Sequence, residues 1–447
     1  MRIGFFHRKN HTTSSFRVIL LGFLGLILLG GLVLTLPFCS RSGTSTPFSD
    51  AIFTSVSAAC VTGLVVQDTA THWSVWGQMV ILILIQIGGL GVITVALTFF
   101  RLWGRRISLA QRNMMQQSIS APQVGGIVRR AGFIFRGSVC IELGGAVLLA
   151  PIFCRDFGFL KGLWYSVFHA VSAFCNAGFD LMGVRGHYSS LTSYGSDLWV
   201  NTVIMLLIIV GGIGFLVWED LRENKLHLHS CKLQTKLVLV TSAVLILLPA
   251  ALNFLLEFQS MPLKDRILAS LFQSVTTRTA GFNTADLTKM SEPAILRMIV
   301  LMLVGGSPGS TAGGMKTTTL AVLFLAGATV FRRRDDVECF RRRIGQDVIR
   351  NAGTILFLYL ALFTVGAAAL SRVEGLPLLP CMFETSSAVG TVGLSLGITP
   401  ALHQSSRLVL MVLMFLGRVG ALTLVFALLP GGNNPPGRKP LDTVTVG

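Results

Sequence analysis

Long apolar runs separated by short polar segments make up most of this chain. A helix needs about 20 apolar residues to cross the hydrocarbon core of a bilayer, and seven continuous runs have this length or come close to it. They cover residues 18–38, 75–100, 131–154, 199–218, 237–256, 353–370 and 408–429. An eighth run, 294–331, is interrupted by a polar stretch. The pattern predicts an all-α, multi-pass membrane protein with eight transmembrane helices.

Four short segments between these runs resemble one another. They are FTSVSAACVTGL (53–64), FHAVSAFCNAGF (168–179), FQSVTTRTAGF (272–282) and FETSSAVGTVGL (383–394). Each begins with Phe, continues through small and hydroxyl side chains and reaches a glycine, and the glycines recur about every 110 residues, as expected of an internal repeat. We therefore predict four repeats of span, short helix, glycine turn and span. They cover residues 1–105, 106–226, 227–335 and 336–430, and a cytosolic tail, 431–447, follows.

Each short helix, at about 10 to 12 residues, cannot cross a bilayer. It must enter the membrane and return, and non-helical backbone is tolerated at that depth only where it lines a water-filled path or is buried in protein. Glycine adopts positive φ without penalty, so four such re-entrant turns around a pseudo-fourfold axis can offer a ring of carbonyl oxygens to a monovalent cation. The alternative is that these glycines only allow close helix packing. The predicted ion ligands are Val61, Thr62, Gly63, Asn176, Ala177, Gly178, Thr279, Ala280, Gly281, Thr391, Val392 and Gly393.

Charge gives the topology. Only 13% of the residues are charged, whereas soluble domains carry about 25%. The net charge is +17, and most of the basic residues lie in the N-terminal segment and in the alternate loops 101–130, 222–236 and 332–350. This asymmetry indicates that both termini and the basic loops face the cytosol. The charge thus points to membrane lipids as the environment and argues against nucleic acid as a partner.

Three of the glycine segments resemble a known family. NAGF (176–179), TTRTAGFNT (276–284) and GTVGLS (390–395) are similar to the filter loops of the Trk/Ktr/HKT superfamily of potassium uptake proteins, and the resemblance extends over essentially the whole chain. Because the first repeat begins almost at the N-terminus, the chain resembles the KtrB branch most. The resemblance implies the ion-conducting subunit of a potassium uptake system in the bacterial cytoplasmic membrane, with K⁺ bound at the filter. It also implies a homodimer that binds a cytosolic nucleotide-binding ring of KtrA type.

The sequence leaves alternatives open for the transported ion and for the class of protein. Glycine in all four turns favours K⁺, because a serine at the position of Gly63 accompanies Na⁺ permeation in some plant relatives. Dependence on Na⁺, or conduction of Na⁺ or ammonium by a member of the same superfamily, remains an alternative. No organic cofactor and no enzymatic activity are expected, because the chain has no catalytic triad, metal-ligand spacing or nucleotide motif. A membrane enzyme or substrate transporter with a polar site at Lys316, Arg418 and Glu142 is the hypothesis from another class.

The polar stretch VGGSPGSTAGGMKTTT (304–319) interrupts the eighth run. Proline and repeated glycine end a helix, so we expect an intramembrane loop that faces water below the filter. In the resembled family the matching loop is a gate, and Arg418 in the last span is expected to hold it shut through loop carbonyls. A phosphate-binding loop is disfavoured because Met315 separates the glycine from the lysine, and an inert kinked helix is the other alternative. The predicted gate comprises Gly305, Gly306, Ser307, Pro308, Gly309, Ser310, Thr311, Ala312, Gly313, Gly314, Lys316 and Arg418.

Other polar residues near the predicted pore receive supporting roles. His169 and Glu384 follow the first Phe of the second and fourth segments and are expected to brace the filter backbone from behind. Arg278 is expected to support the third turn from outside the pore, since a guanidinium on the axis would block cations. For Glu142, in the third span with Arg136, a structural role is preferred over a functional one. The basic run 331–343 is interpreted either as a solvated helix near anionic lipids or as a docking surface for a regulatory partner.

Overall fold

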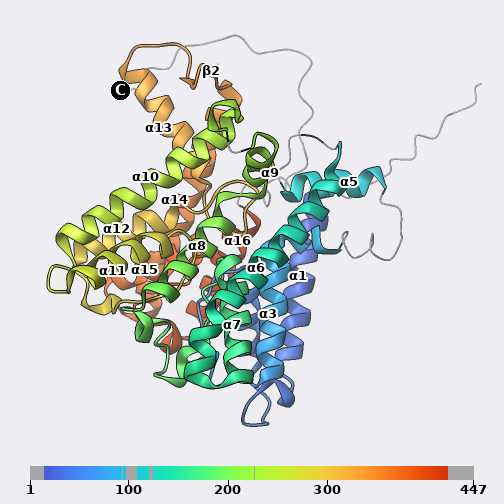
Figure 1. Ribbon diagram of the computed structural model, residues 1–447, viewed down its shortest axis with the longest axis vertical. Coiled ribbons are helices and arrows are strands. Elements are labelled where there is room, and N and C mark those ends of the chain that lie inside the picture. The colour runs from blue at the N-terminus through green and yellow to red at the C-terminus, as the bar shows by residue number, and fades with distance from the viewer. Residues whose placement is uncertain are drawn as a thin grey trace, which may run out of the picture.

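Four long apolar helices lie on the outside of the molecule. The computed structural model describes residues 15–92, 94–96, 108–119, 123, 125–225 and 227–420. Within that part of the chain, four helices are long and apolar enough to cross a membrane (Figure 1). They are α1 (Ser15–Leu34), α6 (Ile127–Phe157), α10 (Leu233–Leu256) and α14 (Gln346–Glu374). Their exposed surfaces carry mainly leucine, valine and phenylalanine, as expected of helices that face lipid. The prediction of an all-α, multi-pass membrane protein is confirmed.

A shorter helix with a buried inner half follows each long one. The four are α2 (Phe48–Ala59), α7 (Phe159–Phe174), α11 (Leu263–Thr276) and α15 (Leu378–Gly390). With 12 to 16 residues and a rise of about 1.5 Å per residue, none of them reaches across a hydrocarbon core of about 30 Å. All four begin several residues before the Phe at which the repeated segments start. Each of these phenylalanines is fully buried: Phe53, Phe168, Phe272 and Phe383.

Within the described residues, the second helix of every repeat ends early. Helix α3 (Val75–Leu90) ends at Gly91, and α16 (Gln404–Val419) ends at Gly420. Helix α8 (Leu198–Ile213) turns by 89° into α9 (Phe215–Glu223) at Gly214. The three glycines have φ values of 87°, 90° and 106°, and a residue at positive φ ends a helix. The uninterrupted spans expected over 75–100, 199–218 and 408–429 are therefore wrong. The sequence remains apolar through each of these glycines, so hydropathy does not reveal where the helix ends.

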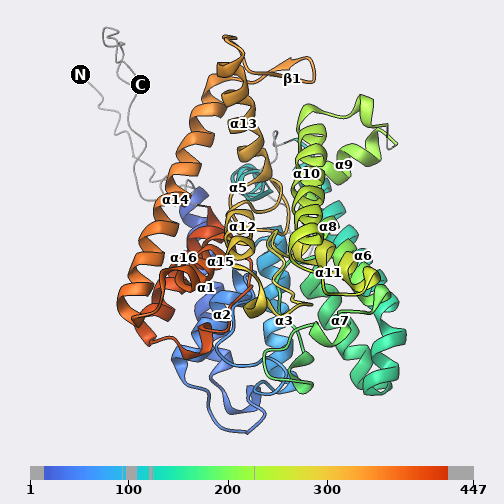
Figure 2. The same ribbon diagram turned by 90° about the vertical axis from the view of Figure 1, so that its left-hand side faces the viewer.

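The third repeat has the longest break. Helix α12 (Glu292–Leu303) and helix α13 (Thr317–Phe331) are separated by the predicted loop. Helix α13 then runs beside α14 to a two-stranded hairpin at one end of the molecule, as Figure 2 shows. The hairpin consists of β1 (Glu338–Cys339) and β2 (Arg342–Arg343). The run 331–343 is thus a hairpin after Phe331 and not the solvated helix of the first interpretation, because Phe340 and Arg341 adopt the positive φ of a hairpin turn.

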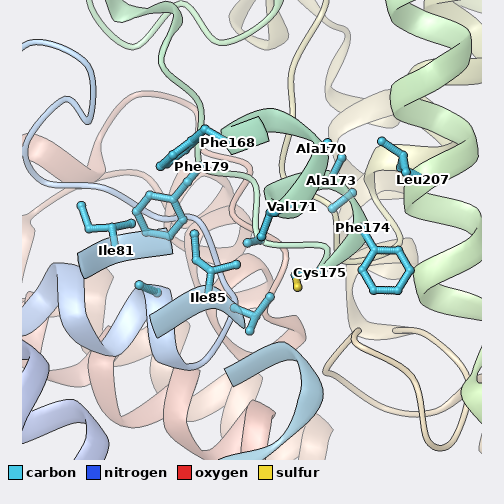
Figure 3. Close-up of a cluster of buried hydrophobic side chains, with 14 of the residues drawn as sticks. Ile81, Ile85, Phe168, Ala170, Val171, Ala173, Phe174, Cys175, Phe179 and Leu207 are labelled. Atoms are coloured by element: carbon cyan, nitrogen blue, oxygen red, sulfur yellow. The ribbon is translucent and has the colours of Figure 1, made fainter. Parts of the chain in front are cut away.

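The short helices form the core of the molecule. Figure 3 shows Phe168, Val171 and Phe174 of α7 packed between Ile81 and Ile85 of α3 and Leu207 of α8. Small residues along the same helix, among them Ala170 and Ala173, are also fully buried. The short helices are therefore fixed on several sides, and their C-terminal ends lie in the interior of the protein.

The remaining elements are peripheral. Helix α5 (Leu109–Ile119) lies next to α1 and α6, and single-turn helices occur at Pro37–Cys39, Met182–Val184, Thr192–Tyr194, Leu228–Ser230, Leu287–Lys289 and Thr399–Ala401. All eight cysteines are unpaired. The predicted repeat boundary after residue 335 falls between α13 and β1. Those after 105, 226 and 430, the predicted tail 431–447 and both termini lie outside the described residues, so the division into repeats stays a prediction.

Candidate functional site

Four glycine turns follow the C-terminal ends of the short helices. Gly63, Gly178, Gly281 and Gly393 have φ values of 94°, 68°, 80° and 92°. The residue two positions before each glycine is also at positive φ: Val61, Asn176, Thr279 and Thr391. A non-glycine residue at positive φ is uncommon, and alternation of left- and right-handed conformations turns successive peptide groups to one side of the chain. All four turns therefore share one unusual backbone conformation.

Backbone hydrogen bonds hold each turn against its own helix. The amides of Thr62, Ala177 and Val392 each donate to a helix carbonyl five residues earlier, at 2.8 Å. In the third turn Ala280 donates to the carbonyl of Thr276 at 3.0 Å. Because the amide groups point back at the helix, the carbonyl groups of the turns are free to face the other way.

The four turns meet one another in a closed cycle. A Cβ atom added to Gly63 would lie within 3.0 Å of the carbonyl oxygen of Ala177, in the second turn. The same holds for Gly178 and Ala280, for Gly281 and Val392, and for Gly393 and Thr62, which closes the cycle. The turns therefore form a ring in repeat order, which we call the glycine ring. One carbonyl oxygen lies at each of the four contacts between neighbouring turns. A side chain at any of the four glycine positions would collide with one of these oxygens.

An acidic cavity lies against the ring. It has a volume of about 120 Å³ and is lined by all four glycines together with Asp68 and Asp180. Its lining contains no lysine or arginine. Asp68 is fixed there by the amides of Ala70 and Tyr188, each at 3.0 Å. A cavity with negative charge and no positive charge raises the local concentration of cations, and these two aspartates were not among the predicted site residues.

Hydroxyl groups on the short helices brace the ring. The amides of Gly63 and Gly393 donate to the Oγ atoms of Ser57 and Ser387, at 3.1 and 3.0 Å. In the other two turns the hydroxyl donates to the carbonyl just after the glycine, Ser172 to Phe179 at 2.7 Å and Thr276 to Phe282 at 2.6 Å. Sequence reasoning missed these residues. The signal was present, because the fifth position of all four repeated segments is Ser or Thr.

His169 and Glu384 hold the segments that leave the ring. His169 Nε2 accepts the amide of Leu181 at 3.3 Å, with Nδ1 at 2.7 Å from the carbonyl of Tyr165. The carboxylate of Glu384 accepts the Ser395 hydroxyl at 2.6 Å and the Leu396 amide at 3.1 Å. Both side chains are fully buried and neither lines the acidic cavity. These contacts favour the hypothesis that they support the ring from behind.

Two other charged residues lie away from the ring axis. The guanidinium of Arg278 donates to the hydroxyl of Ser242 on α10 at 3.2 Å, on the side of the turn away from the cavity. The carboxylate of Glu142 on α6 accepts the Gln86 amide of α3 at 2.9 and 3.1 Å. Arg136 instead bonds the carbonyl of Gly132 within its own helix. Glu142 thus joins two helices, in keeping with the structural role preferred for it.

The predicted gate loop lies directly against the ring. Its ends pair with each other, as Gly305 donates to the carbonyl of Met315 at 2.7 Å. Thr311 donates through its hydroxyl to the carbonyl of Phe174, at the end of α7, at 3.0 Å. A Cβ atom on Gly313 would collide with the side chain of Thr391, in the fourth turn. The loop therefore touches the end of α7 and the fourth turn at once.

Most of the loop is buried, contrary to the expectation that it faces water. Ser307 and Thr311 donate through their amides to the carbonyls of Gly212 and Gly211 at 3.0 and 3.3 Å. The amide of Phe215, the first residue of α9, donates to the carbonyl of Gly309 at 2.7 Å. The break between α8 and α9 thus supplies the hydrogen bonds that water would otherwise provide, which satisfies the requirement for polar backbone inside a membrane.

The side chains of Lys316 and Arg418 also bind the backbone carbonyls of this loop. Lys316 Nζ donates to the carbonyl of Ala312 at 2.8 Å, and the carbonyl of Gly313 lies 3.5 Å from it. Arg418 donates to the carbonyl of Thr311, and also to Gly88 and Gly89 at the end of α3, at 2.5 and 3.0 Å. Across the described residues neither cation forms a salt bridge with a carboxylate. All predicted gate residues are therefore brought together, and backbone carbonyls hold both charges.

Long lipid-facing helices around a ring of backbone carbonyls with an acidic cavity beside it define a membrane protein that transports cations. The chain matches the TrkH family, whose description is cation transport protein, over residues 26–434. This chain therefore belongs to the TrkH family of cation transport proteins, and the predicted membership of the Trk and Ktr group is confirmed.

Individual relatives are similar over almost their full length. The chain is 40% identical to the potassium/sodium uptake protein NtpJ of Enterococcus hirae, over 98% of this chain and 99% of that protein. It is 39% identical to the Ktr system potassium uptake protein B of Bacillus subtilis, over 92% of each chain. The solved structure of the potassium transporter TrkH from Vibrio parahaemolyticus has a TM-score of 0.74 and 19% identity, covering 95% of this chain and 86% of that one. The last comparison shows the shared fold.

Proposed function

We propose that this chain is the ion-conducting subunit of a potassium uptake system, in which the glycine ring is the selectivity filter. The closed cycle of four glycine turns carries this proposal. Carbonyl oxygens that converge from four turns replace the hydration shell of K⁺, and the acidic cavity concentrates cations at the ring. The relatives named potassium uptake proteins support K⁺ as the ion.

The ion is held by the turns already described. The backbone oxygens of the glycine and of the two residues before it, in all four turns, are the proposed ligands. A membrane potential moves each inward K⁺ downhill by about 2.3 kcal/mol per 100 mV. Transport therefore needs no chemical step in this chain, and we propose that it is not an enzyme.

Sodium is the second candidate ion. The relative from Enterococcus hirae is named a potassium/sodium uptake protein, and this name favours Na⁺ as either a permeating or a coupled ion. Each turn contributes only a short stretch of carbonyls with the shared conformation. Fewer stacked oxygen rings should discriminate less strictly between the two ions.

The intramembrane loop is the proposed gate. It touches the fourth turn of the ring and the end of α7, and Lys316 and Arg418 place two positive charges directly beneath the path. These charges repel a permeating cation, and their hydrogen bonds to loop carbonyls keep the loop in place. Opening then requires the loop to break its hydrogen bonds to Arg418 and to the backbone where α8 ends and α9 begins.

Two surface features support a proposal about partners. We propose a homodimer in the bacterial cytoplasmic membrane, with both termini in the cytosol and a nucleotide-binding ring of KtrA type bound on that side. An apolar groove of about 430 Å³ between α14 and α16 supports a second copy as neighbour. The exposed basic hairpin after α13 supports docking of a cytosolic partner, because α13 begins at the loop.

Uptake of radiolabelled Rb⁺ and Na⁺ into proteoliposomes tests the proposal. The wild-type chain, Gly281→Ser and a form lacking residues 309–314 are compared. We expect Rb⁺ uptake in preference to Na⁺, loss of that preference in Gly281→Ser, and faster uptake without the loop segment. Equal uptake of both ions by the wild type and by Gly281→Ser would contradict the filter, and unchanged uptake after the deletion would contradict the gate.

A further inference from the structure

The breaks in the second helices follow one sequence pattern. Three of them read GGLG (88–91), GGIG (211–214) and GGSPG (305–309), and the fourth reads GRVG (417–420). The first glycine packs on the end of its own short helix. A Cβ atom on Gly88, Gly211 or Gly417 would collide with the carbonyl oxygen four residues before the ring glycine, that of Ala59, Phe174 or Val389 respectively. Arg418 therefore stands where the other three repeats have Gly89, Gly212 and Gly306.

The hydrogen-bond acceptors of Arg418 within the described residues are all backbone oxygens, and the side chains of Cys60 and Cys175 lie nearby. Its guanidinium donates to the carbonyls of Gly88, Gly89 and Thr311. The first two belong to the last turn of α3, where carbonyls lack helical partners and the helix dipole adds partial negative charge. Gly88 also accepts the amide of Gly91 at 3.3 Å, so the end of α3 is closed off and its oxygens are held in place. The third oxygen belongs to the gate loop.

Three carbonyl oxygens without a carboxylate are an unusual environment for an arginine. Buried arginines are ordinarily paired with an acid. Backbone carbonyls that converge without an acid are instead the ligands that proteins offer to a dehydrated alkali ion. Lys316 has the same kind of environment, since its ammonium is held by the carbonyls of Ala312 and Gly313. Both gate cations thus occupy positions with the chemistry of a monovalent cation site.

We propose that the carbonyls of Gly88, Gly89 and Thr311 form a second monovalent-cation site below the ring, which the tethered guanidinium of Arg418 fills in the closed protein. This inference rests on the proposed filter and gate. When the arginine leaves, a permeating ion takes over the same oxygens. Arg418 and the transported ion therefore compete for one site, and the gate responds to the ion concentration beneath the filter.

Replacement of Arg418 by glycine tests the site, because it restores the residue of the other three repeats. Arg418→Gln serves if the glycine variant fails to fold. Arg418→Lys keeps a tethered cation and is the matched control. Gly281→Ser is added to every form, so that ion binding at the ring does not dominate the measurement.

Ion binding is measured by thermal unfolding in a buffer whose only other cation is a large organic one, and the unfolding midpoint is recorded as RbCl is added. Ligand binding to the folded state raises the midpoint with the logarithm of ligand concentration, and we expect an additional rise of about 3 °C in the glycine form over a hundredfold range of Rb⁺. The lysine form should lack this rise. Anomalous scattering from Rb⁺ in crystals of the glycine form should place an ion among the three oxygens.

The outcomes separate this inference from the proposed function. A glycine form with the same Rb⁺ dependence as the lysine form, and no ion at the three oxygens, overturns the second site, even if Rb⁺ uptake rises and the gate is supported. An Rb⁺-dependent rise with an ion at the three oxygens supports the second site. That result holds even if proteoliposomes show no Rb⁺ uptake and the conduction proposal fails.

Discussion

The glycine ring and the proposed gate differ in how closely they follow the fourfold repeat. At the ring all four repeats supply the same backbone conformation, the same glycine and a hydroxyl brace at the same position. At the breaks below it the repeats diverge, since two keep a plain glycine break, one carries the loop and one carries an arginine. The equal part has the geometry to select an ion, and the unequal part has the geometry to control its passage. Selection needs equal oxygens around an axis, whereas a gate needs one element able to move against others that stay.

The sharpest test of the equal part is to insert a side chain into each turn separately. Serine at Gly63, Gly178, Gly281 or Gly393 would be strained at positive φ by about 1–2 kcal/mol and would meet the carbonyl of the next turn. We expect each variant to lose the preference for Rb⁺ over Na⁺ by at least about tenfold, which corresponds to about 1.4 kcal/mol. Competitive uptake assays measure this ratio.

The control for these four variants is Gly144→Ser on α6, where an added Cβ has no atom within 4 Å. It should behave as the wild type. If one ring variant retained full selectivity while the other three lost it, the turns would not be equivalent, and the comparison would have to be revised.

Neutralising Arg418 tests the unequal part. Hydrogen bonds to charged groups contribute about 1.5–3 kcal/mol, so Arg418→Gln should shift the gate toward its open form by about tenfold. Rb⁺ uptake should rise accordingly, with the Rb⁺ to Na⁺ ratio unchanged. Arg418→Lys is the control and should remain close to the wild type. A change in selectivity without a change in rate would assign Arg418 to the filter.

Removal of a single brace is expected to have a smaller effect. Ser57→Ala leaves the amide of Gly63 without its side-chain acceptor, at a cost of about 1 kcal/mol. We expect a drop in ion preference of about threefold to fivefold, because one turn of four is loosened. Thr364→Ala on α14 removes a hydroxyl that bonds its own helix far from the ring and is the matched control. Equal losses in both variants would point to general destabilisation.

The basic hairpin should matter least for the chain alone. Arg341→Glu combined with Arg342→Glu reverses charge on exposed side chains that bond neither the loop nor the ring. Uptake by the isolated chain should change by less than about twofold, since surface substitutions rarely exceed about 0.5 kcal/mol. Binding of a KtrA-type ring, measured by co-purification, should fall, whereas Lys289→Glu in the single-turn helix before α12 should leave it unchanged. Unaltered binding in the double variant would exclude the hairpin as the docking surface.

The sequence predicted the parts of the molecule that depend on local backbone requirements. Four glycines at matching positions after short apolar segments indicated the turns, because only glycine adopts positive φ without strain, as Gly63 and its three counterparts do. Pro308 and the repeated glycines beginning at Gly305 indicated the loop, because both residue types end a helix. Neither inference needed knowledge of distant contacts.

The parts that were missed depend on tertiary neighbours or on glycines hidden in apolar runs. The breaks at Gly91, Gly214 and Gly420 lie within strongly hydrophobic sequence, so hydropathy alone suggested continuous spans. Burial of the loop was missed because its hydrogen-bond partners, Gly211 and Gly212, are about a hundred residues away in the chain. Asp68 is held at the cavity in part by the amide of Tyr188, which is 120 residues away in the chain.

The closed cycle of the ring also bears on how the protein is made. Its last link joins Gly393 of the fourth turn to the carbonyl of Thr62 in the first. During synthesis the first three turns are complete before the fourth has left the ribosome, yet the ring stays open until α15 is inserted. The glycine ring is therefore the last part of this region to assemble, and a chain cut short before α15 lacks the fourth turn that closes it.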